Sequence, residues 1–203
     1  MTYACPMSTF PAAPRSRIAQ DLPPGLEIRL MREADLKTYK ALRDAMLARH
    51  EEAFTSDAAA ERGRDAESYR SRLSGAGHCL FTLLAWDGPQ LLGALSAERD
   101  SRAKIRHIAH IVGMMVDEAA QGRGLGRALM QAALALLAQD EALQLVTLSV
   151  TRSNRPARRL YERCGFARYG RLEGAIVLPD GRVLDKDLMV HRLRPGAPPA
   201  PGA

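Results

Sequence analysis

Three glycines stand at alternate positions, Gly122, Gly124 and Gly126, directly before an apolar run with helical spacing. A helix N-terminus offers unpaired N–H groups and a partial positive charge, and glycine lets a ligand approach the main chain closely. Arg123 and Arg127 add positive charge within the same segment. These residue types at this spacing predict a binding site for a phosphate or pyrophosphate group.

Two familiar phosphate-binding loops do not fit this segment. The dinucleotide fingerprint G-x-G-x-x-G meets Arg127 at its third glycine when it starts at Gly122, and Leu129 when it starts at Gly124. The P-loop needs Gly-Lys followed by Ser or Thr, and the chain has no such triplet. A plain tight turn without a ligand therefore stays open as the alternative.

Asn154 and Tyr161 form a second polar pair, seven residues apart in a segment with a helical pattern. Seven residues are nearly two helical turns, so both side chains are expected on one face, with the small Ala157 between them. An amide and a phenol in this arrangement could contact the two ends of an extended ligand arm.

The apolar pattern indicates the elements that position these groups. Strand patterns fall at 26–31, 78–87, 90–99, 104–117, 143–150, 166–174 and 182–193, and helical patterns at 35–50, 65–74, 124–138 and 154–164. Gly165 is expected to close the last helix. The order β-α-α-β-β-β-α-β-α-β-β predicts an α/β layered domain with a mixed sheet.

The chain has 203 residues, 46% of them apolar, which suits one domain with a full core. Residues 1–24 and 195–203 are rich in proline and small residues, so we expect flexible tails around a domain at 25–194. No apolar run is long enough to span a membrane, and the first residues lack the apolar segment of a secretory signal.

Charge and cysteine content narrow the function classes. The net charge is +6, and 25 of the 29 basic residues are arginine, which favours a polyanionic partner but does not separate nucleic acid from a phosphorylated cofactor. Cys5, Cys79 and Cys164 have neither paired nor metal-like spacing. We therefore expect reduced thiols, a cytoplasmic location and no metal site, with Cys79 and Cys164 in the core.

Two blocks of the sequence resemble the GNAT superfamily of N-acetyltransferases. Residues 121–126 match its acetyl-CoA loop, Gln/Arg-x-x-Gly-x-Gly/Ala, at every position, and MMV at 114–116 matches the end of its fourth strand. NRPARRLYERCGF at 154–166 fits its Asn-x-x-Ala-x-x-Leu-Tyr-Glu-x-x-Gly-Phe pattern at each fixed position. The resemblance implies a mixed, mostly antiparallel sheet with splayed central strands flanked by helices, and acetyl-CoA as co-substrate.

The resemblance also implies a mechanism. The backbone of the fourth strand would hold the pantetheine arm in the splay, and Gly113 could permit a bulge there. The N–H of Val116 would stabilise the oxyanion while an amine attacks directly, and Tyr161 would give a proton to the departing thiolate. The residues implied in acetyl-CoA binding are Met114, Met115, Val116, Gln121, Gly122, Arg123, Gly124, Leu125, Gly126, Arg127 and Asn154.

The general base is left open. Counting back from Val116 in twos places His110 on the same strand face, where many members of the family carry a glutamate. A neutral histidine can accept a proton, directly or through water; the alternative is an interior histidine held by hydrogen bonds. Glu98, at the end of the preceding strand, is a second candidate. Residues expected to help line the acceptor site are Arg43, Glu51 and Glu52.

The sequence thus predicts an N-acetyltransferase that moves an acetyl group from acetyl-CoA to a primary amine of a small molecule or protein. A non-catalytic acyl-CoA sensor is the alternative, against which Tyr161 argues because binding needs no proton donor. The arginines are not interleaved with aromatic residues, so neither a nucleic-acid nor a membrane partner is expected. Many members of the family are dimers, so the resemblance admits a homodimer. The acceptor and the acyl chain are left open.

Overall fold

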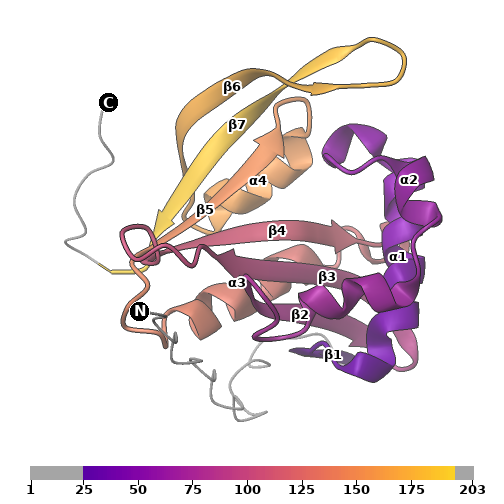
Figure 1. Cartoon of the computed structure of the whole chain (residues 1–203), viewed down its shortest axis with the longest axis horizontal. Coiled ribbons are helices and arrows are strands. Elements are labelled where there is room, and N and C mark those ends of the chain that lie inside the picture. Colours follow the sequence, from indigo (N-terminus) through magenta and orange to yellow (C-terminus); the bar gives the residue numbers. More distant parts are fainter. Residues whose placement is uncertain (1–24, 195–203) are drawn as a thin grey trace, which may run out of the picture.

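The computed structural model describes residues 25–194, which build one seven-stranded sheet with helices on both faces (Figure 1). The tails expected at 1–24 and 195–203 lie outside the described residues. The strands are β1 (Leu26–Leu30), β2 (Cys79–Asp87), β3 (Gln90–Arg99), β4 (Ile108–Val116), β5 (Leu145–Thr151), β6 (Ala167–Val177) and β7 (Val183–Arg192). The helices are η1 (Glu33–Asp35), α1 (Leu36–Arg49), η2 (Glu51–Ala53), α2 (Ala58–Arg62), η3 (Ala66–Arg72), η4 (Glu118–Ala120), α3 (Leu125–Leu137) and α4 (Arg155–Arg163).

The sheet opens at its centre. Its strand order is β1-β2-β3-β4-β5-β7-β6, and every neighbouring pair is antiparallel except β4 and β5. These two parallel strands pair only from Ile108 to His110 and from Leu145 to Thr147, and beyond that point they diverge (Figure 1). The mixed, mostly antiparallel sheet with splayed central strands is therefore confirmed.

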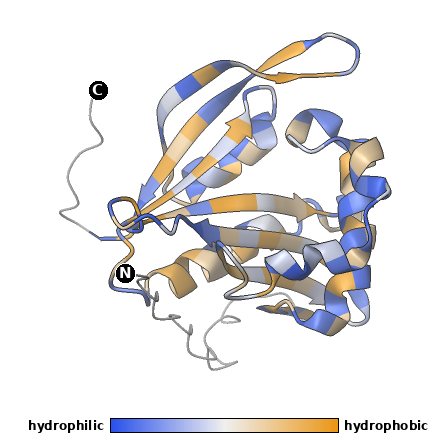
Figure 2. Ribbon diagram, viewed as in Figure 1, coloured by the Kyte–Doolittle hydropathy of each residue, from blue (hydrophilic) through white to orange (hydrophobic). Residues whose placement is uncertain are grey.

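Two apolar clusters hold the helices against the sheet. Helix α3 buries the stripe that its spacing predicts, and it packs on one face together with Tyr161 of α4. Helix α1 and Tyr69 of η3 cover the other face. Figure 2 shows the hydrophobic residues concentrated along the central strands and α3. The described helices include none long and apolar enough to cross a membrane.

The structure differs from the expected elements in two regions. Residues 66–72 form a 3₁₀ helix, where an α-helix was expected at 65–74, and α2 was not expected at all. Both begin at an aspartate cap: Asp57 accepts from the N–H of Ala60 at 2.7 Å, and Asp65 from that of Glu67 at 2.9 Å. They are too short for apolar periodicity to reveal. Strand β4 begins at Ile108, not at 104, because the preceding residues fold into consecutive turns.

A bulge in β4 reverses which face its side chains occupy. Across from β3, Ala94 pairs with Met115 and Ser96 with Val112, so residues 113 and 114 oppose the single residue between them. Gly113 takes φ +59 there, a left-handed conformation that suits glycine. Ile111 before the bulge and Val116 after it consequently pack into the same α3-side cluster. The expectation that His110 shares a face with Val116 is wrong, because simple alternation fails across a bulge.

Candidate active site

The glycine loop at the end of β4 has the conformation that its residue types demand. Gly122 and Gly124 have φ +77 and +78, and Gly124 is the N-cap of α3. A β-carbon placed on either glycine would meet no atom within 4 Å. Backbone conformation therefore selects glycine at both positions, and the space above the loop is open.

The start of α3 presents unused hydrogen-bond donors to that space. The first helical bond runs from the N–H of Ala128 to the carbonyl of Gly124, at 3.0 Å. Among the described residues, the N–H groups of Leu125, Gly126 and Arg127 have no backbone acceptor. Gly124 has no side chain that could cap them. Three amides and the helix dipole thus favour an anion at this point.

Gly126 has a different role from the other two glycines. A β-carbon there would lie 3.1 Å from Cδ2 of Leu160 and 3.4 Å from Cε of Met114. Its missing side chain therefore lets α3 approach α4 and β4 closely. Sequence spacing alone could not separate this packing role from the conformational role of Gly122 and Gly124.

The two arginines beside the loop differ in their partners. Arg123 pairs with Asp87 at the end of β2, with 3.0 Å between Nη2 and Oδ2. Arg127 is exposed and forms no ion pair with any described residue. Burial raises the pKa of the Cys164 thiol, and the charge of Arg127 opposes that shift. Arg127 is thus the arginine whose charge is available to a ligand.

The N–H of Val116 points into the splay. Backbone N–H groups alternate between the two edges of a strand, and the next N–H, of Asp117, donates to the carbonyl of Leu92 on β3 at 2.7 Å. The N–H of Val116 therefore faces the opposite edge, toward β5. The side chain of Met115 is buried, whereas those of Met114 and Val116 are partly buried. The main chain of this segment, more than its side chains, is open to a ligand.

Tyr161 lies on α4 and is only 8% exposed. Its ring centroid is 6.1 Å from that of Phe166, and its hydroxyl makes no hydrogen bond with a described residue. Burial raises the pKa of Tyr161 to about 12. The phenol consequently stays protonated at neutral pH and has its proton free to donate.

Asn154 is the N-cap of α4. Its Oδ1 accepts from the N–H of Ala157 at 3.1 Å. The helix thus begins one residue later than its pattern predicts, and the common face of Asn154 and Tyr161 stays a prediction. Its Nδ2 group remains for a ligand. Gly165, with φ +84, follows the helix as expected.

His110 and Glu98 meet on the sheet face that α1 covers. They are opposite each other in the β3–β4 register, so their side chains share a face. His110 Nδ1 lies 2.6 Å from Oγ1 of Thr147, and Glu98 pairs with Arg72 of η3. Thr147 is a site residue that sequence reasoning missed, because nothing in the sequence fixes the β4–β5 register.

The η2 segment crosses the mouth of the splay. Nε2 of His50 lies 3.2 Å from Oε1 of Glu118, just after β4, and Oγ1 of Thr151, at the end of β5, donates to the carbonyl of Glu52 at 2.7 Å. A pocket opens beside this segment, and Asn154 contributes to its wall. Glu51 and Glu52, expected to line the acceptor site, also line this pocket. Cys79 is buried as expected, whereas Cys164 is only partly buried. The described residues hold no cluster of three or more groups that could bind a metal ion.

Comparison with curated proteins finds relatives that are longer than this chain. A mycothiol acetyltransferase of Salinispora tropica is 36% identical over 149 residues, which cover 73% of this chain and 47% of that protein. The chain thus spans about half the length of this relative.

Solved structures show the same fold. An acetyltransferase of the GNAT family from Streptococcus pneumoniae superposes with a TM-score of 0.71 at 23% identity, over 82% of this chain and 98% of that one. A Salmonella typhimurium protein solved with its cofactor acetyl-CoA gives 0.66 at 22% identity, over 87% of this chain and 99% of that one. The model of the Acetyltransferase (GNAT) family matches residues 39–166, which is more than half of the chain, and the chain therefore belongs to this family.

Proposed function

We propose that this chain is an N-acetyltransferase that transfers an acetyl group from acetyl-CoA to a primary amine by direct attack. The observation that carries the proposal is the open edge of β4, which leads directly into a loop followed by three unpaired amides. An open strand edge suits the amide groups of a pantetheine arm, and the unpaired N–H groups suit a pyrophosphate. The loop and the splay together match the two halves of acetyl-CoA.

The groups that would hold acetyl-CoA extend from the loop before α3 to the open edge of β4. The pyrophosphate lies over Gly122 and Gly124 and accepts from the N–H groups at the start of α3, with Arg127 adding charge. The pantetheine arm follows the main chain of 114–116, and Nδ2 of Asn154 reaches it from the other side of the splay. Arg123 is held by Asp87, so its role is to fix the loop.

The reaction needs no acyl-enzyme. The amine nitrogen attacks the thioester carbon, and the N–H of Val116 donates to the developing oxyanion. When the C–S bond breaks, the sulfur takes the electron pair and accepts the proton of Tyr161, which solvent then restores. The thiol, with a pKa of about 8.5, is a stronger acid than the phenol, so proton transfer to a free thiolate is unfavourable at equilibrium. The transfer therefore accompanies cleavage of the C–S bond, while negative charge builds up on the sulfur.

We assign the general base to His110. Tyr161 belongs to the cluster on the α3 face of the sheet, and His110 lies on the opposite face. The acid and the base would therefore reach the thioester from opposite faces of the sheet. If Nδ1 of His110 donates to Thr147, the lone pair of Nε2 is left to take the proton of the attacking amine. Glu98 is the weaker candidate because Arg72 already pairs with it.

The test is release of free thiol from acetyl-CoA across a panel of primary amines. We expect turnover with at least one amine, and the same panel identifies the acceptor. Binding of acetyl-CoA without turnover of any amine would instead favour an acyl-CoA sensor. A homodimer and a cytoplasmic location stay predictions, and the acyl chain preference stays open.

A further inference from the structure

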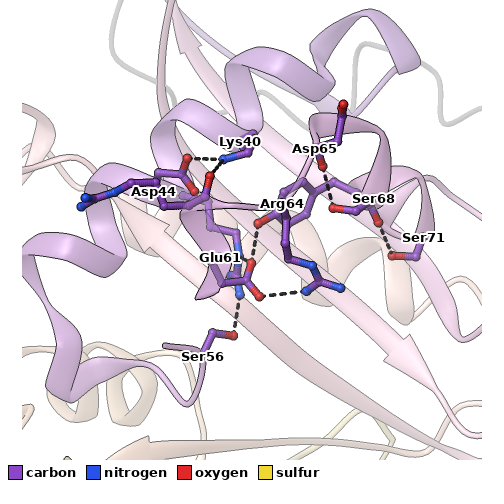
Figure 3. Close-up of polar contacts among 11 residues, drawn as sticks. Lys40, Asp44, Ser56, Glu61, Arg64, Asp65, Ser68 and Ser71 are labelled. Atoms are coloured by element: carbon purple, nitrogen blue, oxygen red, sulfur yellow. Dashed lines mark hydrogen bonds and ion pairs between the residues drawn. The ribbon is translucent and has the colours of Figure 1, made fainter. Parts of the chain in front are cut away.

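Two polar groups without partners border the bulge of β4. The hydroxyl of Tyr39 is completely buried and makes no hydrogen bond of normal geometry with a described residue, although the hydroxyl of Ser96, which bonds Thr82 at 2.8 Å, lies near it. Arg43 is 6% exposed; its Nε lies 3.2 Å from Oε2 of Glu61 and its Nη2 donates to Oγ of Ser56 at 2.8 Å. Figure 3 labels these two partners, Glu61 and Ser56. Nη1 of Arg43 has no partner in the described part of the chain and, unlike the Tyr39 hydroxyl, is not completely buried.

Both groups approach the same point. A β-carbon placed on Gly113 would lie 3.9 Å from Nη1 of Arg43 and 3.9 Å from the hydroxyl oxygen of Tyr39. Gly113 stands three residues before Val116, within the part of β4 that does not pair with β5. Donors from α1 therefore meet the strand beside the proposed site of acetyl transfer, on the face that also carries His110.

The surroundings of Arg43 are positively charged. Glu61 accepts hydrogen bonds from Nε of Arg43, from the hydroxyl of Tyr69 and, at 2.9 Å, from Nη1 of Arg64. Figure 3 shows the contact between Glu61 and Arg64. Two guanidinium groups thus share one carboxylate, so the cluster keeps an excess positive charge. The neighbouring Arg72 is balanced by Glu98 and does not change this sum. An anion placed at Nη1 would be attracted.

A purely structural role explains only part of this arrangement. The ion pair with Glu61 and the bond to Ser56 account for two nitrogens of Arg43, but they leave the third nitrogen and the Tyr39 hydroxyl unused. An unpaired buried hydroxyl is destabilising, and a phenylalanine would fill the same space without that cost. The unused pair is explained by a ligand that accepts hydrogen bonds.

We infer that Arg43 and Tyr39 bind a carboxylate on the acceptor, so that the substrate is a primary amine carrying a carboxylate, as an amino acid does. One oxygen accepts from Nη1 of Arg43 and the other from the hydroxyl of Tyr39, a charge-assisted arrangement. This inference rests on the proposed function and names the acceptor class of the same site.

The test compares acceptors that differ only in the carboxylate, namely amino acids and their carboxamides. The measured quantity is the ratio of kcat/KM for the two members of each pair, because a change in acetyl-CoA binding cancels in that ratio. We expect the wild type to prefer the carboxylate. Arg43→Lys should lower the ratio about tenfold or more, and Tyr39→Phe should lower it several-fold.

Arg64→Gln is the matched control. Arg64 contacts the same carboxylate of Glu61 but is largely exposed, so its loss should leave the ratio unchanged. If Arg43→Lys fails to fold, Tyr39→Phe decides alone, since it removes only an unpaired hydroxyl. Turnover with no preference for the carboxylate, or with a preference that Tyr39→Phe leaves intact, overturns this inference and leaves the proposed function standing. No turnover and no binding of acetyl-CoA would overturn both.

Discussion

Tyr161 lies in an environment that keeps its phenol protonated. A tyrosine exposed to water begins to lose its proton near pH 10, whereas burial raises the pKa of Tyr161 to about 12. The acid form therefore persists across the whole working range of an enzyme. No described residue competes for the proton, because the hydroxyl has no hydrogen-bond partner.

Replacing Tyr161 with phenylalanine should lower turnover by about 10² to 10⁴ while acetyl-CoA affinity stays within a few fold. The change removes the proton donor but keeps the ring that packs near Phe166. Single-turnover kinetics and a binding isotherm measure the two quantities separately. If the rate of the chemical step is unchanged in Tyr161→Phe, water protonates the thiolate instead. If the wild-type rate falls between pH 8 and 10 because Tyr161 ionises, its pKa is not raised.

Removing the imidazole of His110 should abolish the rise of rate with pH near neutrality while acetyl-CoA binding is preserved. His110→Ala lacks the base, whereas His110→Glu should retain part of the activity. Most primary amines lose their proton near pH 9–10, so the rise of rate caused by the acceptor amine should appear at a clearly higher pH than the rise caused by His110. Unfolding must be measured alongside the rate, because loss of the bond to Thr147 could also weaken the fold. A stable His110→Ala protein with the wild-type pH profile would rule the histidine out as base.

At the scale of elements, the β4 bulge decides which groups meet. It turns Val116 toward α3 and leaves His110 on the α1 face, so that the proposed acid, Tyr161, and the proposed base, His110, lie on opposite faces of the sheet. Gly113 makes this possible through its left-handed conformation. The functional geometry of the strand therefore depends on a residue that contributes no side chain.

Gly113→Ala should impair catalysis more than stability. A left-handed alanine is disfavoured by roughly 1–2 kcal/mol, and relief of that strain would shift the bulge and the N–H of Val116. Gly174→Ala is the matched control, because Gly174 has nearly the same φ, +61, but lies in β6. Both variants should lose similar stability in denaturant titrations, and only Gly113→Ala should lose turnover by tenfold or more. Equal activity in the two variants would mean that the bulge does not set the site.

The elements also show where sequence reasoning holds and where it ends. The buried stripe of α3 and the glycine after α4 follow from local chemistry, and both are as expected. The reversed faces of β4 and the contact of His110 with Thr147 depend on strand register, which no local pattern encodes. Asn154 was assigned by spacing, yet a capping bond places it outside the helix. Helices and their capping residues can be predicted from the local sequence, whereas the register between strands cannot.

At the scale of the whole molecule, the cluster around Glu61 ties three helical segments together. Burial alone would raise the pKa of Glu61, but hydrogen bonds from Tyr69, Arg43 and Arg64 outweigh burial and lower it to about 2. These partners come from η3, α1 and the segment after α2. The helical cover of the α1 face thus depends on one ionised carboxylate.

Stability should therefore fall in acid because of this group. The folded pKa of about 2 lies below the ordinary value of 4.5, so the unfolded chain binds the proton more readily. The contribution is complete above pH 4.5 and disappears as the pH falls toward 2. Glu61→Gln should lower the unfolding free energy at pH 7 and flatten its decline between pH 4.5 and 2; an unchanged slope would show that other carboxylates cause the acid sensitivity.

Binding of acetyl-CoA by the loop after β4 can be measured through the melting temperature of the protein with and without acetyl-CoA. A ligand that binds only the native state stabilises it by about 2.7 kcal/mol at a hundredfold excess over its dissociation constant. We predict a clear upward shift for the wild type and for Gly181→Val. Gly181 shares the left-handed conformation and open surroundings of Gly124 but lies in the β6–β7 turn. Gly124→Val, whose branched side chain would occupy the approach of the pyrophosphate, should lose most of the shift. A wild-type protein whose melting temperature does not respond to acetyl-CoA would contradict the account.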